Sequence, residues 1–203
     1  IDDAANFNIV ISAPDINVSS KDFGVIDRDT ISFGLSAIKN VGAKAAESIE
    51  EYRTKEQLTY NTIFDLVSIG DNVINRKSLE SLISSGATLN LEGSLAQQFD
   101  GVDIALKYAQ HFNKKINIDQ GNIFTSGGVE LDYPIPKLPD SVDWKKSDIL
   151  AKEKKYLGMY LSGNPMESYM DDIKDFEIIP KKFNSNSLVR VGGIISNTNL
   201  LYD

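Results

Sequence analysis

The stretch that decides the fold is ISFGLSAIKNVGAKAAESI, which runs from Ile31 to Ile49. Its β-branched start predicts the end of a strand, and the rest predicts a short helix, a tight turn and an alanine-rich second helix. The turn is Asn40-Val41-Gly42, and Asn40 is among the few non-glycine residues that tolerate a left-handed backbone. Four apolar residues recur at helical spacing and are expected to pack the two helices together: Ile38, Val41, Ala45 and Ile49.

The turn gives this helix pair the layout of a helix-hairpin-helix, a motif that holds nucleic-acid backbone without reading base sequence. Backbone N–H groups at the start of the second helix have no intrahelical partner, and they carry the positive end of the helix dipole. A phosphate oxygen is expected to bind there, because Gly42 keeps side-chain bulk away and the lysines on either side add charge. The predicted DNA-binding residues are Lys39, Asn40, Val41, Gly42, Ala43 and Lys44.

This interpretation has a plainer alternative, an ordinary αα-hairpin whose apolar stripe serves only packing. The phosphate hypothesis predicts weak binding that is indifferent to base sequence and has a small salt dependence. It also predicts that an acidic residue in place of Val41 or Lys44 abolishes the binding.

The chain has 203 residues, 41% of them hydrophobic, and a formal net charge of −8. The apolar content is enough for one large domain or two small ones. The acidic balance argues against a surface wholly dedicated to DNA, although a local phosphate site made of backbone amides needs no excess of lysine. Absence of cysteine, of a signal peptide and of a membrane-length apolar run predicts a cytoplasmic protein. Because the sequence starts at Ile1 without methionine, we expect a piece of a longer protein.

The pattern around the first hairpin predicts a mainly helical chain with a small β-hairpin near its start. Phe23 to Phe33 is expected to form that β-hairpin, with Asp27-Arg28-Asp29 as its turn. Asn75 and Gly86 are expected to cap the two ends of a further helix, the second and degenerate half of a tandem helix-hairpin-helix. Ser94 to Phe112 then predicts a longer amphipathic helix.

The composition changes after Phe112. Asn113 to Asp143 is polar, contains three prolines and a Gly-Gly pair, and predicts a linker without regular structure. A helical pattern resumes from Trp144 to Leu161, and a brief helix is expected from Met166 to Ile173. The segment LVRVGGII, Leu188 to Ile195, predicts a strand.

Side-chain patterns for catalysis or metal binding are weak in this chain. With no cysteine and a single histidine, His111, there is no zinc or thiol site to propose. Asp27 and Asp29 are a pair of carboxylates, the residue type that holds metal ions in nucleotidyl transfer. Aspartates are also favoured at hairpin tips, and we prefer this turn interpretation. We therefore predict no catalytic residue, no metal ligand and no cofactor here.

The predicted linker contains a second informative motif, Gln120-Gly121-Asn122-Ile123-Phe124. A glutamine followed by an aliphatic and an aromatic residue at these positions is the pattern of peptides that bind the bacterial sliding clamp. Ile123 and Phe124 would fill adjoining apolar pockets while Gln120 satisfies polar groups at the rim. The alternative is a linker segment that folds back on its own core.

Four segments occur in this chain in a fixed order: GLSAIKNVGAKAAESI, TIFDLVSI, INRKSLESLISSGA and EKKYLGMYLSGNPMESY. In this order they resemble the alpha subunit of bacterial DNA polymerase III, of the DnaE class, and the resemblance covers nearly the whole chain. LGMYLSGNP, Leu157 to Pro165, is its most specific part. The chain departs from the family at Asn164, where histidine is usual, and at Asn40, where glycine is common.

The resemblance implies the region that follows the fingers of the polymerase. Residues 1–33 would be the end of the fingers, 34–112 a tandem helix-hairpin-helix DNA-binding domain and 113–143 a linker with the clamp-binding peptide. A helical connector, 144–180, and the start of an OB fold, 181–203, would follow. The parent would be a DNA-directed DNA polymerase, a nucleotidyltransferase with Mg²⁺ in its palm. Its catalytic aspartates would lie upstream of Ile1, so the fragment is expected to be inactive alone.

The resemblance also implies partners. This region would bind duplex DNA non-specifically and tether the enzyme to the sliding clamp (the beta subunit) for processive replication. It would also contact other subunits of the polymerase III holoenzyme, and no membrane partner is expected. The leading rival is a structural connector between fingers and OB domains that has negligible DNA binding. A third interpretation, a DNA-repair hairpin protein unrelated to replication, explains neither LGMYLSGNP nor the peptide motif.

Overall fold

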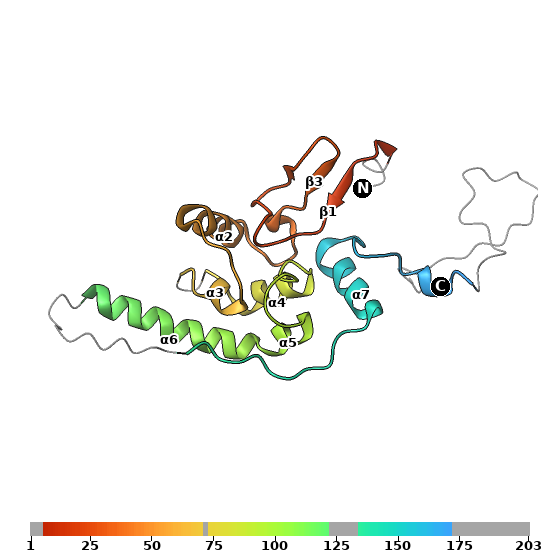
Figure 1. Ribbon diagram of the computed structural model, residues 1–203. Helices are drawn as coiled ribbons and strands as arrows, with labels where there is room; N and C mark the ends of the chain where they lie inside the picture. The colour runs from red at the N-terminus through yellow and green to blue at the C-terminus, as the bar shows by residue number, and fades with distance from the viewer. Residues whose placement is uncertain (1–5, 71–72, 122–133, 172–203) are drawn as a thin grey trace, which may run out of the picture. The chain divides into compact units, whose positions relative to one another are not determined.

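The computed structural model describes residues 6–70, 73–121 and 134–171 (Figure 1). Ile1–Ser162 form one compact unit, and a second unit begins at Gly163. The described elements of the first unit are, in chain order, β1 (Val10–Ser12), β2 (Gly24–Val25), β3 (Thr30–Ser32), the 3-10 helix η1 (Leu35–Ala37) and the helices α2 (Ala43–Glu56), α3 (Ile63–Val67), α4 (Arg76–Ser84), α5 (Leu95–Asp100), α6 (Val102–Gly121) and α7 (Lys146–Leu157). The mainly helical fold with a small sheet near the N-terminus is as the sequence predicts.

The sheet has three short strands in the order β1-β3-β2. β2 and β3 are antiparallel, which confirms the predicted β-hairpin. At its tip the Asp27 Oδ1 accepts the N–H of Asp29 at 2.9 Å, so turn chemistry explains this aspartate pair. β1 pairs with β3 in parallel, with Ile11 opposite Ile31. This pairing was not predicted, because a three-residue strand with a distant partner leaves no local pattern in the sequence.

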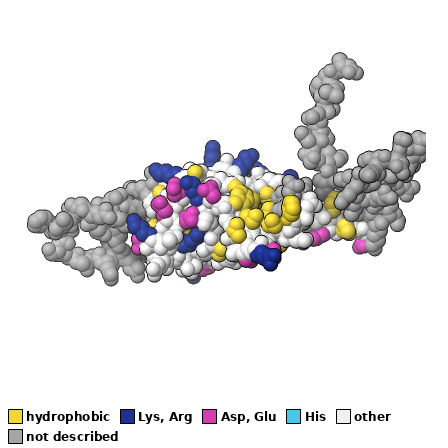
Figure 2. All heavy atoms as spheres, turned by 90° about the horizontal axis from the view of Figure 1, so that it is seen from above, with side chains coloured by type: hydrophobic (Ala, Val, Ile, Leu, Met, Phe, Trp, Pro, Cys, Tyr) yellow, Lys and Arg dark blue, Asp and Glu magenta, His cyan; other side chains and the backbone are white. Residues whose placement is uncertain are grey.

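Four apolar side chains in and beside the sheet are exposed. Val10 is 60% exposed, Phe23 50%, Val25 80% and Ile26 51%. Figure 2 shows hydrophobic side chains gathered on the face seen from above, beside a charged region. The sheet region therefore exposes apolar side chains, while Ile11 of β1 packs against the core.

The helix-hairpin-helix stripe lies in the core, as predicted. Ile38 is 1% exposed, Val41 4%, Ala45 8% and Ile49 0%. These side chains pack in one cluster with the apolar residues of α3, α4 and α6. Burying this stripe stabilises the pair of helices that frames the turn.

Capping residues define three of the helix starts. Thr62, Asn75 and Ser94 each accept a hydrogen bond from the N–H three residues later, and the residue at that position closes a capping box at α3, α4 and α5. α4 ends at a left-handed Gly86, with φ of 81°, and the N–H of Ala87 returns to the Leu82 carbonyl at 3.0 Å. The predictions for Asn75 and Gly86 are therefore confirmed.

The predicted helix from Ser94 to Phe112 is two helices. Gly101 ends α5, and α6 starts at the next residue. A Cβ at Gly101 would lie 2.8 Å from Leu138 Cδ2, so the extended segment before α7 packs closely against this junction. The break thus has a packing cause in addition to the low helix propensity of glycine.

α6 continues through Gly121, so the prediction that regular structure stops at Phe112 was wrong for residues 113–121. The polar segment that follows Phe112 contains no proline or glycine before Gly121. Extending an existing helix is much easier than nucleating one, so polarity alone does not end it. Residues 134–143, which include the three prolines, have no regular structure, as predicted.

α7 is shorter than the predicted Trp144–Leu161 helix. It ends at Gly158, whose φ of 79° is left-handed. The brief helix predicted from Met166 begins as a 3-10 turn, η2 (Glu167–Tyr169), in the second unit. The predicted strand Leu188–Ile195, and the OB fold that it would open, lie outside the described residues.

Candidate nucleic-acid interface

The turn between η1 and α2 has the predicted backbone. Asn40 adopts a φ of 66°, in the left-handed region that asparagine tolerates. Gly42 is the N-cap of α2, with extended backbone at φ −70° and ψ 153°. No heavy atom lies within 4 Å of a Cβ placed on Gly42. Glycine is therefore not required by packing here, and the space in front of it is open.

The N-terminus of α2 has no side-chain cap. Its first intrahelical bond joins the Ala46 N–H to the Gly42 carbonyl. Of the three residues between, Ala43 and Lys44 are exposed and Ala45 is buried. This contrasts with α3, α4 and α5, whose first N–H groups are closed by capping boxes. The start of α2 thus offers the N–H groups of two exposed residues, Ala43 and Lys44, at the positive end of a helix dipole.

Two long-range hydrogen bonds fix the turn. The Lys39 N–H donates to the Tyr156 carbonyl of α7 at 2.9 Å, and the Asn40 Nδ2 donates to the Ser81 Oγ of α4 at 3.1 Å. Asn40 therefore shapes the turn while its amide is occupied by α4. Sequence reasoning missed Ser81 and Tyr156, because neither has a motif that marks it as an anchor.

Val41 does not belong to the exposed part of the predicted site. Its side chain is 4% exposed in the core, and its N–H donates to the Ile38 carbonyl at 3.0 Å. The sequence assigns this residue to both the apolar stripe and the predicted phosphate-binding turn, but in the fold its side chain belongs to the stripe. The exposed members of the predicted site are Lys39, Asn40, Gly42, Ala43 and Lys44.

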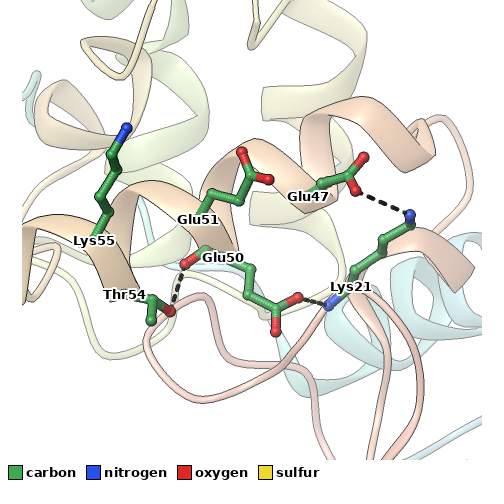
Figure 3. A pocket seen from close by; sticks show the side chains of 6 residues that line it. All are labelled: Lys21, Glu47, Glu50, Glu51, Thr54 and Lys55. Atoms are coloured by element: carbon green, nitrogen blue, oxygen red, sulfur yellow. Dashed lines mark hydrogen bonds and ion pairs between the residues drawn. The ribbon is translucent and has the colours of Figure 1, made fainter.

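Charge changes sign along α2. Beyond Lys44 the helix carries Glu47, Glu50 and Glu51, which line a depression together with Lys21, Thr54 and Lys55 (Figure 3). The Lys21 Nζ lies 3.4 Å from the Glu47 Oε1, and the Lys21 N–H donates to the Glu50 Oε2 at 2.6 Å. This acidic surface disfavours phosphate along the body of α2, so nucleic acid is favoured only at the start of the helix.

Only one of the three predicted clamp-binding residues lies within the described residues. The backbone of Gln120 belongs to the last turn of α6, whereas Ile123 and Phe124 lie outside the described residues. Among residues 6–70, 73–121 and 134–171, no group of three or more acidic, histidine or cysteine side chains is placed to hold a metal ion. Over the same ranges no helix has the length and apolar character needed to cross a bilayer.

A family model described as a helix-hairpin-helix motif matches residues 8–98. The DNA polymerase III alpha subunit of Xylella fastidiosa is 30% identical over 199 residues, which are 95% of this chain and 16% of that protein. The alpha subunit of Borreliella burgdorferi is 30% identical over 212 residues, 99% of this chain and 18% of that protein. That of Escherichia coli is 32% identical over 177 residues, 87% of this chain and 15% of that protein.

The chain spans about a sixth of the length of these curated relatives. The matched helix-hairpin-helix range contains the buried stripe, the left-handed Asn40 and the uncapped start of α2. Similarity extends beyond that range along nearly the whole sequence. The chain accordingly belongs to the family of DNA polymerase III alpha subunits, of which it represents one segment.

Proposed function

We propose that this segment holds duplex DNA by its sugar–phosphate backbone, in a replicative DNA polymerase. The observation that carries the proposal is the exposed, uncapped N-terminus of α2 directly after the left-handed Asn40, inside the range matched by a helix-hairpin-helix model. The N–H groups of this first helical turn would donate to a phosphate oxygen, and Lys39 and Lys44 would add positive charge.

A structural role is the second candidate, and the two anchors of the turn favour it. Hydrogen bonds from Lys39 to α7 and from Asn40 to α4 would serve a hairpin that only joins neighbouring parts of the polymerase. The net charge of −8 also favours the structural role, because an acidic chain is expected to bind DNA weakly. Measured DNA affinity separates the two roles, since a pure connector would not distinguish a lysine at the turn from one elsewhere on α2.

Lys44→Glu is expected to lower the affinity of the 203-residue chain for a fluorescent duplex about fivefold or more at low salt, because it replaces an attraction to phosphate by a repulsion. The slope of log affinity against log salt should fall by about 0.9 for each phosphate that the variant no longer neutralises. Fluorescence anisotropy with two duplexes of unrelated sequence measures both quantities, and the two sequences should give equal affinities.

Lys55→Glu is the matched control. It makes the same charge change at the other end of α2, beside the acidic depression. Equal affinities of the Lys44→Glu and Lys55→Glu variants would contradict phosphate binding at the turn and favour the connector.

We propose in addition that the parent enzyme carries out nucleotidyl transfer with Mg²⁺ held elsewhere in its polypeptide. The bond from the Asp29 N–H to the Asp27 Oδ1 explains this aspartate pair by turn formation, so the proposal does not place the metal ligands here. On this proposal the 203-residue chain does not polymerise nucleotides by itself.

Gln120, Ile123 and Phe124 are proposed to bind the sliding clamp within the polymerase III holoenzyme. The support is sequence: two adjacent bulky apolar residues follow shortly after Gly121 in a polar setting. DNA held at the hairpin would make clamp binding intramolecular, with a high effective concentration that favours processive synthesis.

Replacing both Ile123 and Phe124 by alanine is expected to weaken clamp binding at least about tenfold, because it removes two side chains that would fill pockets on the clamp. The effect is smaller than their full transfer free energy, because part of that free energy offsets the entropy cost of ordering the peptide. Asn122→Ala, in the same segment, should bind as the unsubstituted chain does. Calorimetric titration of the clamp from the same organism gives the comparison. Equal affinities for the double variant and Asn122→Ala would rule out the motif as the tether.

A further inference from the structure

α7 and its flanks are basic in an acidic chain. Residues 144–162 contain two acidic side chains, Asp148 and Glu153, and five lysines: Lys145, Lys146, Lys152, Lys154 and Lys155. This local excess of positive charge stands against a net charge of −8 for the whole sequence. An excess so placed indicates a surface that faces a negatively charged partner.

The buried Glu153 makes the exposed surface of α7 still more basic. Its side chain is 6% exposed, and its Oε2 accepts the N–H groups of Leu161 at 3.0 Å and Ser162 at 3.2 Å. These bonds fold the chain after Gly158 back toward the helix. The carboxylate is therefore turned inward, while Lys154 and Lys155 remain exposed.

The basic end of α7 meets the hairpin turn. Tyr156, the neighbour of Lys155, accepts the Lys39 N–H through its carbonyl at 2.9 Å. Two residues on, the Gly158 carbonyl accepts the Lys154 Nζ at 3.0 Å. Carbonyls at a helix C-terminus carry the negative end of the dipole and repel phosphate. Here the backbone N–H of Lys39 and the Nζ of Lys154 each donate to one of these carbonyls, which reduces the repulsion of phosphate beside the turn.

Lys155 is next to Tyr156 in sequence and also contacts its side chain. Its Nζ lies 5.1 Å from the centroid of the Tyr156 ring, and the side chain is exposed. Lys152 is less exposed, and its Nζ lies over two rings, those of Trp144 and Phe99, at 4.1 Å and 4.9 Å from their centroids. Lys145, before the first turn of α7, is at the opposite end of the helix from the hairpin.

We propose that the C-terminal turn of α7 is a second nucleic-acid backbone contact, in which Lys154 and Lys155 bind phosphate beside the hairpin lysines Lys39 and Lys44. The inference rests on the proposed function of the hairpin and extends the DNA-binding surface to an element more than a hundred residues later in the sequence. The Lys39–Tyr156 hydrogen bond would then have a role in binding, because it joins the backbone of the turn to that of the C-terminal turn of α7.

The test compares Lys155→Gln with Lys145→Gln and Lys55→Gln in the 203-residue chain, using the same fluorescent duplex. Each variant removes one positive charge, so the change in net charge is equal. Lys155→Gln is expected to lower affinity about threefold at low salt and to reduce the salt slope by up to about 0.9. The two controls should each change affinity by less than half as much, and Lys155→Arg should bind as the unsubstituted chain does.

Equal decreases in affinity for Lys155→Gln and Lys145→Gln, with Lys44→Glu still weakening binding, would overturn the α7 contact and leave the hairpin proposal intact. Absence of binding by the unsubstituted chain would overturn both. Thermal unfolding of every variant by circular dichroism shows that affinity is compared between equally folded proteins.

Discussion

Gly34→Ala is expected to lower the free energy of unfolding by on the order of 3 kcal/mol, the upper range for forcing extra atoms into a packed site. A Cβ at Gly34 would lie 2.6 Å from both the carbonyl carbon of Asp22 and the backbone nitrogen of Phe23. These are backbone atoms, so no side-chain rotation relieves the overlap. The backbone bonds from Leu35 to Ser20 and from Ser36 to Lys21, at 3.0 Å and 2.9 Å, hold the two segments together on this side.

Gly42→Ala is the matched control, because its added methyl group meets no heavy atom within 4 Å and its φ of −70° suits alanine. The weaker N-cap preference of alanine should cost about 1 kcal/mol or less. Urea unfolding followed by circular dichroism measures both variants. Similar midpoints for Gly34→Ala and Gly42→Ala would show that the Gly34 segment does not approach the 22–23 backbone as described.

The hairpin was predictable because its signals are local. Spacing of three and four residues placed Ile38, Val41, Ala45 and Ile49 on one buried stripe, and Asn40 is a residue that marks a left-handed turn. The ends of α4 were predictable for the same reason, since caps act within one helical turn of the residue that carries them.

The missed features depend on partners far along the chain. β1 is recognised as a strand only by its pairing with β3, and the anchors of the turn join Lys39 to Tyr156 and Asn40 to Ser81. No periodicity within either segment encodes such contacts. For the candidate site, sequence therefore predicted the loop and its lysines but not the helix that holds the loop in place.

Two boundary errors have a different origin. α6 passes through a polar segment that lacks a helix breaker before Gly121, and α7 ends at Gly158 in place of the later Ser162-Gly163. Polar composition did not end the first helix, because a helix already formed extends through any residue that keeps its backbone donor and its helical dihedrals. The second helix ends where a glycine adopts a left-handed φ of 79°, so backbone conformation set its boundary.

Val41→Asp is expected to unfold most of the hairpin region, with a decrease in stability of on the order of 4 kcal/mol, because it places an unpaired carboxylate in the core. Val41 is 4% exposed and packs in the cluster that contains Ile38 and Ile49. A decrease of this size is comparable with the total stability of a typical domain, which is about 5–15 kcal/mol. Thermal unfolding by circular dichroism should show a lowered and broadened transition.

The pH dependence of this variant separates burial of a charge from a change of shape. A buried carboxylate has its pKa raised above the unfolded value, so the folded state binds the proton more tightly and the variant regains stability as pH falls through the raised pKa. The side chain in Val41→Asn has the shape of aspartate but does not titrate. The stability that this variant loses relative to the unsubstituted chain should therefore stay constant between about pH 7 and 5. Equal pH profiles for the aspartate and asparagine variants would show that residue 41 is solvated in the folded protein.

Weakened DNA binding in Val41→Asp therefore has an explanation in folding alone, and it cannot serve as evidence for phosphate contact at the turn. Lys44→Glu does not share this ambiguity, because Lys44 is exposed and lies two positions after the N-cap of α2. An acidic residue near a helix N-terminus interacts favourably with the dipole, so Lys44→Glu should unfold no more easily than the unsubstituted chain. A Lys44→Glu protein with full stability and weakened DNA binding, beside an unstable Val41→Asp protein, would assign the first residue to the interface and the second to the core.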